Sequence, residues 1–284
     1  MINSFCNQNY LTNCKGAFSM IKWIISDMDG TLLVDHNKLP EDFDEVMQLL
    51  KEKNIMFSPA SGRQYQALAV HFPKYKDDLL FISENGTYVC QHDKELFSYT
   101  LSPDNVALVL EQVLKLPDVF VVVSGKKSSY VMSQHPAFVA ELNLYFTHYT
   151  VVEDFSHIDD DIIKFSICDA LNHHARENIY NKLQSLNEKV QVVLSSEIWV
   201  DIMPIGANKG LAIKKLQEKL NIKPEECVAF GDYLNDYEML QSVYYSYAME
   251  NAAPELKKIA RFIAPPNYEN GVMNTIRKLL SEQK

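Results

Sequence analysis

An apolar run that ends in two closely spaced carboxylates constrains this chain more than any other feature. Residues 24–33 read Ile-Ile-Ser-Asp-Met-Asp-Gly-Thr-Leu-Leu, with acids at Asp27 and Asp29. In a strand, residues two apart point the same way, so we expect both carboxylates to converge where the strand ends. Open α/β sheets bind ligands at that edge, and like charges so close need a cation or a shared proton. The segment predicts a metal site, an acid–base pair or both, with an ordinary Asp-Gly turn as the structural alternative.

Strand and helix patterns alternate through both ends of the chain. The N-terminal part predicts strands at 22–26, 55–59 and 79–83 and helices at 40–54 and 64–71. The C-terminal part predicts strands at 227–230, 245–249 and 261–264 and helices at 208–220, 237–242, 254–259 and 270–280. Such alternation favours a parallel sheet with right-handed crossovers. We therefore expect the α/β class, with a Rossmann-like parallel-sheet core and helices on both faces.

The middle of the chain follows a different pattern. Hairpins are expected within 87–99, 119–133 and 191–202, a strand at 162–168, and helices at 103–116, 136–143 and 172–186. Hairpins mixed with helices are typical of an α+β domain with mostly antiparallel pairing. The sequence thus predicts an N-terminal extension (1–20), a core built from 21–86 and 204–284, and an inserted cap domain (87–203) of ordinary domain size.

Charge and cysteine content narrow the class of protein. The formal net charge of −10 argues against non-specific nucleic-acid binding, which needs a basic face. No apolar stretch approaches the ~20 residues of a membrane span, and residues 1–19 lack the apolar core of a signal peptide. Five cysteines without a CxxC pair indicate neither a disulfide framework nor a zinc site. We expect a cytoplasmic protein with no membrane or nucleic-acid partner, and the oligomeric state stays open.

Three more polar groups are expected at the same edge of the core. They are Ala-Ser-Gly-Arg at 60–63, Asn-Lys-Gly at 208–210, and Phe-Gly-Asp-Tyr-Leu-Asn-Asp at 230–236. Small residues at a helix start suit a phosphate or another oxyanion. Each group has a structural alternative, because Ser61 can cap a helix, Lys209 can be an exposed lysine, and the acids can form a turn and a cap. Their convergence on one edge favours a site.

The order and spacing of these motifs resemble the haloacid dehalogenase (HAD) superfamily of phosphohydrolases. The matching motifs are DxDGT at 27–31, SGR at 61–63, the lone Lys209, and GDxxND at 231–236. The chain looks most like the Cof-type branch, whose large α/β (C2B-like) cap lies between the second and third motifs. The resemblance covers about residues 21–284.

The resemblance implies a role for each acid. Asp27 would be the nucleophile that forms an aspartyl-phosphate, and Asp29 would protonate the leaving oxygen and later activate water. Mg²⁺ would be the cofactor, held by the Asp27 carboxylate, the Asp29 backbone carbonyl and Asp232, with Asp236 in support.

The resemblance also implies which residues hold the phosphate. Ser61 and Lys209 would bind phosphoryl oxygens, Gly62 would let the backbone approach closely, and Asn235 would position Lys209 or a phosphate oxygen. The expected activity is hydrolysis of small phosphorylated metabolites, such as a sugar phosphate or a phosphorylated cofactor. A phosphomutase and a non-catalytic metabolite-binding regulator are the alternatives.

Some residues carry no single expectation. Arg63 either contacts substrate phosphate or pairs with a nearby acid. The bulky pair at 233–234 in the fourth motif would narrow the mouth of the site, and many relatives have Asp where this chain has Asn270. Neither departure removes a catalytic group, so both concern substrate preference.

Overall fold

The structure is a computed structural model that describes residues 20–35 and 37–282. The predicted N-terminal extension, 1–20, lies outside the described residues except for Met20. Within the described ranges, no helix has both the length and the apolar character needed to cross a membrane.

A five-stranded parallel sheet forms the centre of the core, in the order β14-β13-β12-β1-β2. Its strands are β1 (Trp23–Ser26), β2 (Met56–Pro59), β12 (Cys227–Gly231), β13 (Tyr245–Met249) and β14 (Phe262–Ala264). All residues of β1 and β12 are buried, so both faces of the sheet are covered there. The predicted α/β class and parallel core are confirmed.

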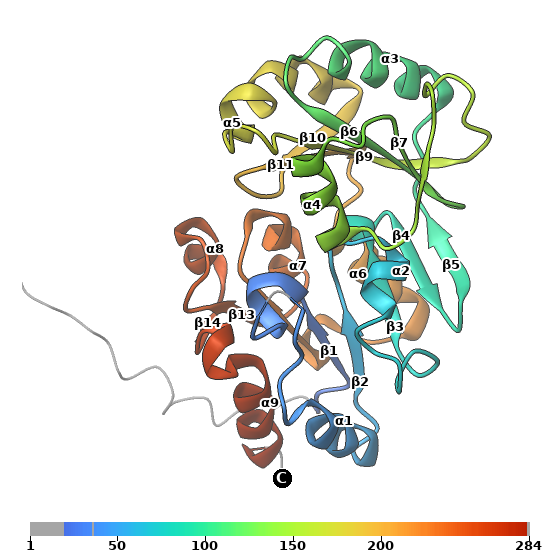
Figure 1. The fold of residues 1–284 in the computed structure, drawn as a ribbon. Coiled ribbons are helices and arrows are strands. Elements are labelled where there is room, and N and C mark those ends of the chain that lie inside the picture. Colours follow the sequence, from blue (N-terminus) through green and yellow to red (C-terminus); the bar gives the residue numbers. More distant parts are fainter. Residues whose placement is uncertain (1–19, 36, 283–284) are drawn as a thin grey trace, which may run out of the picture.

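The helices of the core lie around its parallel sheet (Figure 1). They are α1 (Phe43–Glu52), α2 (Tyr65–Ala69), α6 (Lys209–Leu220), α7 (Tyr237–Gln241), α8 (Pro254–Ile259) and α9 (Gly271–Glu282). Helix α1 packs against α9, while α7 contacts both α6 and α8. Helix α6 begins sharply because the Asn208 side chain accepts a hydrogen bond from the Leu211 amide at 2.7 Å, and it ends at Asn221 in a left-handed conformation. This start fixes the place of Lys209.

A small antiparallel sheet extends the core. It consists of β3 (Leu80–Ser83), β4 (Tyr88–Gln91) and β5 (Lys94–Ser98). An isolated parallel bridge between Ala60 and Ile82 places β3 beside the end of β2. Val89 and Cys90 of β4 belong to the same hydrophobic cluster as the central sheet. We therefore propose that the cap begins after β5, near Tyr99, and not at residue 87.

The cap contains a six-stranded sheet in the order β10-β11-β9-β6-β7-β8, antiparallel except for the β7–β8 pair. Its strands are β6 (Phe120–Gly125), β7 (Ser129–Val131), β8 (Tyr149–Val151), β9 (Ile162–Cys168), β10 (Val190–Leu194) and β11 (Trp199–Pro204). Its helices are α3 (Pro103–Val113), α4 (Pro136–Tyr145) and α5 (Ala175–Asn178), followed by a 3₁₀ segment, η3 (Tyr180–Glu188). The inserted α+β domain is thus as predicted in kind.

Two cap elements differ from expectation. The single helix expected at 172–186 is instead α5 followed by η3, because His173 has a positive φ and Ile179 leaves the helical region at φ −124°. Strand β8 was not predicted, since its three residues are too short to show an alternating pattern.

Candidate active site

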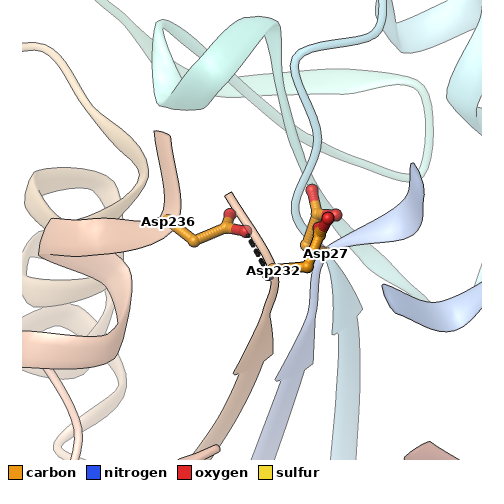
Figure 2. Close-up of side chains that lie close together, drawn as sticks. All are labelled: Asp27, Asp232 and Asp236. Carbon is orange, nitrogen blue, oxygen red and sulfur yellow. Dashed lines mark hydrogen bonds between the residues drawn. The ribbon is translucent and has the colours of Figure 1, made fainter. Parts of the chain in front are cut away.

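The predicted site residues meet at the carboxyl edge of the central sheet. Asp27 follows β1, Asp232 follows the neighbouring β12, and Asp236 closes the short 3₁₀ turn after it. Figure 2 shows the Asp27 and Asp232 carboxylates side by side, with Asp236 turned toward them from the facing segment. Lys209 enters from the first turn of α6. Residues far apart in the sequence are thus gathered at one edge, as the parallel order requires.

The sequence pattern predicted that Asp27 and Asp29 would converge through the alternation of side chains along a strand. In the structure both residues lie beyond the end of the strand. Strand β1 ends at Ser26, and residues 28–32 form a wide turn in which the Leu33 amide donates to the Met28 carbonyl at 2.9 Å. Gly30 has φ +78°, which lets the chain make this turn. Both carboxylates still line one cavity, but Asp27 is buried and the side chain of Asp29 is one-third exposed.

Lys209 links two of the acids. Its Nζ lies 2.6 Å from Asp27 Oδ1 and 2.6 Å from Asp236 Oδ1, and its side chain is fully buried. The other oxygen of Asp236 accepts hydrogen bonds from the backbone amides of Asp232 and Tyr233. Both oxygens of Asp236 therefore have protein partners, whereas the side chain of Asp27, which lines the cavity, has a partner only at Oδ1 among the described residues.

The acidic cluster carries more negative charge than Lys209 balances. Burial raises the pKa of Asp27 to about 7, with the nearby Asp236 carboxylate adding to the rise and Lys209 opposing it. Burial, Asp27 and Asp236 likewise raise the pKa of Asp232 well above its usual range. Burial lowers the pKa of Lys209, but the two carboxylates outweigh it, and the net pKa is raised. A bound cation would relieve this repulsion.

The donor set fits a hard divalent cation. Carboxylate oxygens of Asp27, Asp232 and Asp236 lie within 4.8 Å of one another. Asp232 is held in place because its Oδ1 accepts a hydrogen bond from the Thr31 hydroxyl at 2.9 Å. Oxygen ligands of this kind suit Mg²⁺. Because both oxygens of Asp236 are already used, Asp27 and Asp232 are the carboxylates best placed to touch an ion directly.

Arg63 pairs with an acid, which was one of its two predicted roles. Its Nη2 lies 2.5 Å from Asp29 Oδ1 and its Nε lies 2.8 Å from Asp29 Oδ2. Its guanidinium also reaches Asn37 and His71 and lies 5.5 Å from the ring centre of Tyr145 on the cap. The bidentate contact fixes the orientation of the Asp29 carboxylate at the side of the cavity.

The turn after β2 brings Ser61 and Gly62 to the same cavity. Ser61 is buried, and its Oγ accepts a hydrogen bond from the Arg63 amide at 3.1 Å. Helix α2 begins later, at Tyr65, so Ser61 does not cap it. Asn235 also lines the cavity, and its Nδ2 donates to Asn85 Oδ1 at 3.0 Å. Of the predicted site residues, all except Lys209 and Asp236 line this cavity.

The cavity has a volume of about 310 Å³ and lies between core and cap. The cap residues that line it, none of which the sequence pattern singled out, are Tyr145, Phe146, Lys164, Ser166, Ser195, Ser196, Glu197, Trp199 and Asp201. Tyr233 of the fourth motif lines it too, in agreement with a narrowed mouth, whereas Asn270 bonds to Asp42 away from the site. A lone lysine and a lone aspartate inside apolar strands were the signals that could have revealed Lys164 and Asp201.

A parallel α/β core, an acid-rich edge and a cap inserted over that edge define a protein class with a Rossmann-like core and a separate cap domain. The family model described as haloacid dehalogenase-like hydrolase matches residues 24–276, and the chain belongs to this family. The predicted superfamily is thereby confirmed.

Relatives span nearly the whole chain. A 5-amino-6-(5-phospho-D-ribitylamino)uracil phosphatase from Escherichia coli is 32% identical over 93% of this chain and 97% of its own length. An HMP-PP phosphatase from Klebsiella pneumoniae is 28% identical over 84% of this chain and 87% of its own. A solved structure from Streptococcus mutans, 28% identical, superposes with a TM-score of 0.85 over 92% of this chain and all of that one.

Proposed function

We propose that this chain is a Mg²⁺-dependent phosphomonoester hydrolase that works through an aspartyl-phosphate on Asp27. The observation that carries the proposal is the buried Asp27 carboxylate, bound on one oxygen by Lys209 and facing the cavity beside Asp232. A nucleophile needs a free oxygen, a nearby positive charge and shelter from water, and this position offers all three.

The first half-reaction breaks the ester. An Asp27 carboxylate oxygen would bond to phosphorus while the ester P–O bond breaks, and the leaving oxygen would take a proton from Asp29. In the second half, Asp29 would accept a proton from water, whose oxygen attacks phosphorus and releases Asp27 and inorganic phosphate. In this structure Arg63 pairs with Asp29 beside the cavity.

The phosphoryl group needs donors around it. We assign this role to the Ser61 hydroxyl, the backbone at Gly62, the Asn235 amide and the Lys209 ammonium, which lie around Asp27. Mg²⁺, held by Asp27, Asp232 and the Asp29 backbone carbonyl with support from Asp236, would supply further charge neutralisation when bound.

The substrate is proposed to be a small phosphorylated metabolite. The cavity volume of about 310 Å³ suits a small molecule. The two relatives named above are called phosphatases of a ribitylaminouracil phosphate and of HMP-PP, which favours a phosphorylated cofactor or cofactor precursor for this chain.

The test compares Asp27→Asn with Asp104→Asn, an exposed aspartate on cap helix α3. Release of inorganic phosphate from an aryl phosphate and from a panel of phosphorylated metabolites would be measured with Mg²⁺ and with a chelator. We expect the unaltered protein and Asp104→Asn to release phosphate only with Mg²⁺, and Asp27→Asn to release none. Full turnover by Asp27→Asn would refute the nucleophile, and dependence on an acceptor sugar would indicate a phosphomutase.

A further inference from the structure

A buried carboxylate on the cap reaches into the core. Asp201 lies in the middle of cap strand β11 and is only 4% exposed. Its Oδ1 accepts from the Ser166 hydroxyl at 2.6 Å, and its Oδ2 accepts from the Ser195 hydroxyl at 2.6 Å. A third hydrogen bond comes from the core, where Asn85 Nδ2 donates to Asp201 Oδ2 at 2.7 Å. A cap side chain is thus hydrogen-bonded directly to a core residue, Asn85, that lines the cavity.

Asn85 touches both proposed phosphate-binding elements. It lies between β3 and β4, is 1% exposed, and its backbone amide donates to the Ser61 carbonyl at 2.9 Å. Its carboxamide packs against Gly62, because a Cβ placed on that glycine would lie 3.0 Å from Asn85 Oδ1. The same Oδ1 accepts the hydrogen bond from Asn235. A rotation of the Asn85 carboxamide would therefore change its contacts with both Gly62 and Asn235.

The hydrogen bonds have a fixed direction. An ionised carboxylate can only accept, so Asp201 requires Asn85 to present its NH₂ group to the cap. Asn85 must then present its oxygen to Asn235, which in turn presents its own NH₂ group. One N–H of Asn235 is used in this bond, and its second N–H remains for a phosphate oxygen. An asparagine at position 201 could donate as well as accept, so it would no longer fix the orientations of the Asn85 and Asn235 amides.

A second cap residue supports the same turn. Lys164 on cap strand β9 is 1% exposed, and its Nζ donates to the Gly62 carbonyl at 2.7 Å. It also forms an ion pair with Glu84 and lies 3.8 Å from Asp201 Oδ1. Two strands of the cap therefore support the Ser61–Gly62 turn, β9 directly through Lys164 and β11 indirectly through Asp201 and Asn85.

We propose that Asp201, acting through Asn85, is a positioning residue that orients Asn235 and the Ser61–Gly62 turn for the phosphoryl group. The inference rests on the proposed function, because it concerns the residues that would hold phosphate. Under this proposal, binding of the phosphoryl group depends on the contact between Asp201 of the cap and Asn85 of the core, whatever leaving group the substrate carries.

The first experiment measures inhibition by orthovanadate and turnover of an aryl phosphate, both with saturating Mg²⁺. We expect Asp201→Asn to weaken orthovanadate binding by about tenfold and to lower kcat by a similar factor, because one charge-assisted contact is misdirected. The effect should be the same for every substrate tested. A change confined to KM for one substrate would show direct contact with its leaving group and would overturn the proposal.

A matched control is Asp169→Asn. Asp169 is also a fully buried cap carboxylate, but its partners Asn172, His174 and Asn178 all belong to the cap. We expect this variant to lose thermal stability while keeping its orthovanadate affinity and kcat. Equal losses of kcat in both variants would mean that cap stability alone is responsible.

The double variant Asp201→Asn with Asn85→Asp tests the direction of the hydrogen bonds. An aspartate at 85 would accept from the amide at 201 and from Asn235, which restores the original orientation of Asn235. We expect orthovanadate affinity to recover toward that of the unaltered protein. Failure to recover in a folded double variant, or an unaffected Asp201→Asn, would overturn this inference alone. A chain that releases no phosphate from any ester would overturn the proposed function as well.

Discussion

Gly30 lies against the proposed metal site. It has φ +78°, and a Cβ there would overlap the carboxylate of Asp232. An L-residue at this position would therefore meet two separate penalties, a left-handed backbone and a displaced metal ligand. The two can be separated, because Gly206 has φ +77° but no atom within 4 Å of its added Cβ.

We expect Gly30→Ala to weaken Mg²⁺ binding by about ten- to a hundredfold, as displaced ligand support does in other metal sites. Gly206→Ala should cost about 1–2 kcal/mol of unfolding free energy from backbone strain and leave Mg²⁺ affinity unchanged. Calorimetric titration with Mg²⁺, together with urea unfolding, would measure both quantities. Equal Mg²⁺ affinities in the two variants would argue against Asp232 as a ligand.

Lys209 is the cation that lets Asp27 and Asp236 be buried together. Lys209→Met would leave both carboxylates without their shared partner, and we expect a loss of about 3–5 kcal/mol in the free energy of unfolding. Because Mg²⁺ can replace part of the missing charge, adding it should raise the melting temperature more in this variant than in the unaltered protein.

The control is Lys22→Met, which removes a half-exposed lysine from its pair with Glu226. Exposed pairs contribute only about 0–1 kcal/mol, so urea unfolding should detect little change. A Lys209→Met protein as stable as this control would show that the buried acids are neutral in the folded state.

Asp42, which precedes α1, links this helix to α9 through hydrogen bonds of its carboxylate. Arg277 and Asn270 both donate to its carboxylate, the latter at 2.8 Å, and Arg277 also reaches Glu45 at 2.9 Å. Burial pushes the pKa of Asp42 upward, but the hydrogen bonds from Arg277 and Asn270 prevail and lower it. An aspartate at position 270 would face Asp42 with a like charge, which explains why asparagine suits this chain there.

The pH dependence of this link has a definite sign. A lowered pKa in the folded state stabilises the protein above the unfolded value of about 4, and the contribution disappears as the pH falls through the folded value. Asp42→Asn should therefore lower the free energy of unfolding by about 1–2 kcal/mol near pH 7 and by much less near pH 3. Urea unfolding at both pH values measures the difference. A deficit that stays constant would mean that packing, not charge, is lost.

Most helices and strands of the core were predicted, including short ones such as β14 and α7, whereas the three-residue cap strand β8 was not. The core helices and strands carry clear apolar patterns, and the four motifs are contiguous, so Asp27, Ser61, Lys209 and Asp232 could be found from local sequence. The bidentate pair of Arg63 with Asp29 was one of two possibilities, because a linear sequence does not show which acid lies within reach.

The cap contribution to the site could not be predicted. Asn85 and Asp201 meet across 116 positions of sequence, and each depends on how the cap sheet is placed over the core. The hairpin β4–β5 was expected in the cap because its own pattern is that of any hairpin. Two long-range contacts assign this hairpin to the core. Strand β4 pairs with β3, and its residues Val89 and Cys90 belong to the hydrophobic cluster of the central sheet.

The domain boundary can be tested with two fragments. All buried residues of the two cap clusters lie between Leu101 and Ile202, so a fragment of residues 100–203 contains its own hydrophobic core. We expect it to fold as a monomer with cooperative urea unfolding. A fragment of residues 87–203 adds a hairpin whose apolar side has lost its partner, and it should associate. Circular dichroism and sedimentation would compare them, and a folded, monomeric 87–203 beside an unfolded 100–203 would place the boundary at 87.

The position of β1 between β12 and β2 has a consequence for folding during synthesis. Strand β1 precedes the whole cap along the chain, yet one of its two neighbours in the sheet, β12, begins only at Cys227. At about 5–20 residues per second, roughly ten to forty seconds pass between their syntheses. The last cap strand, β11, ends at Pro204, so the cap sequence is complete before β12 is synthesised, and the cap can fold before Lys209 and Asp232 join Asp27. The proposed nucleophile, Asp27, is therefore synthesised 182 positions before Lys209, and a chain interrupted just before Lys209 would hold a complete cap beside an incomplete proposed site.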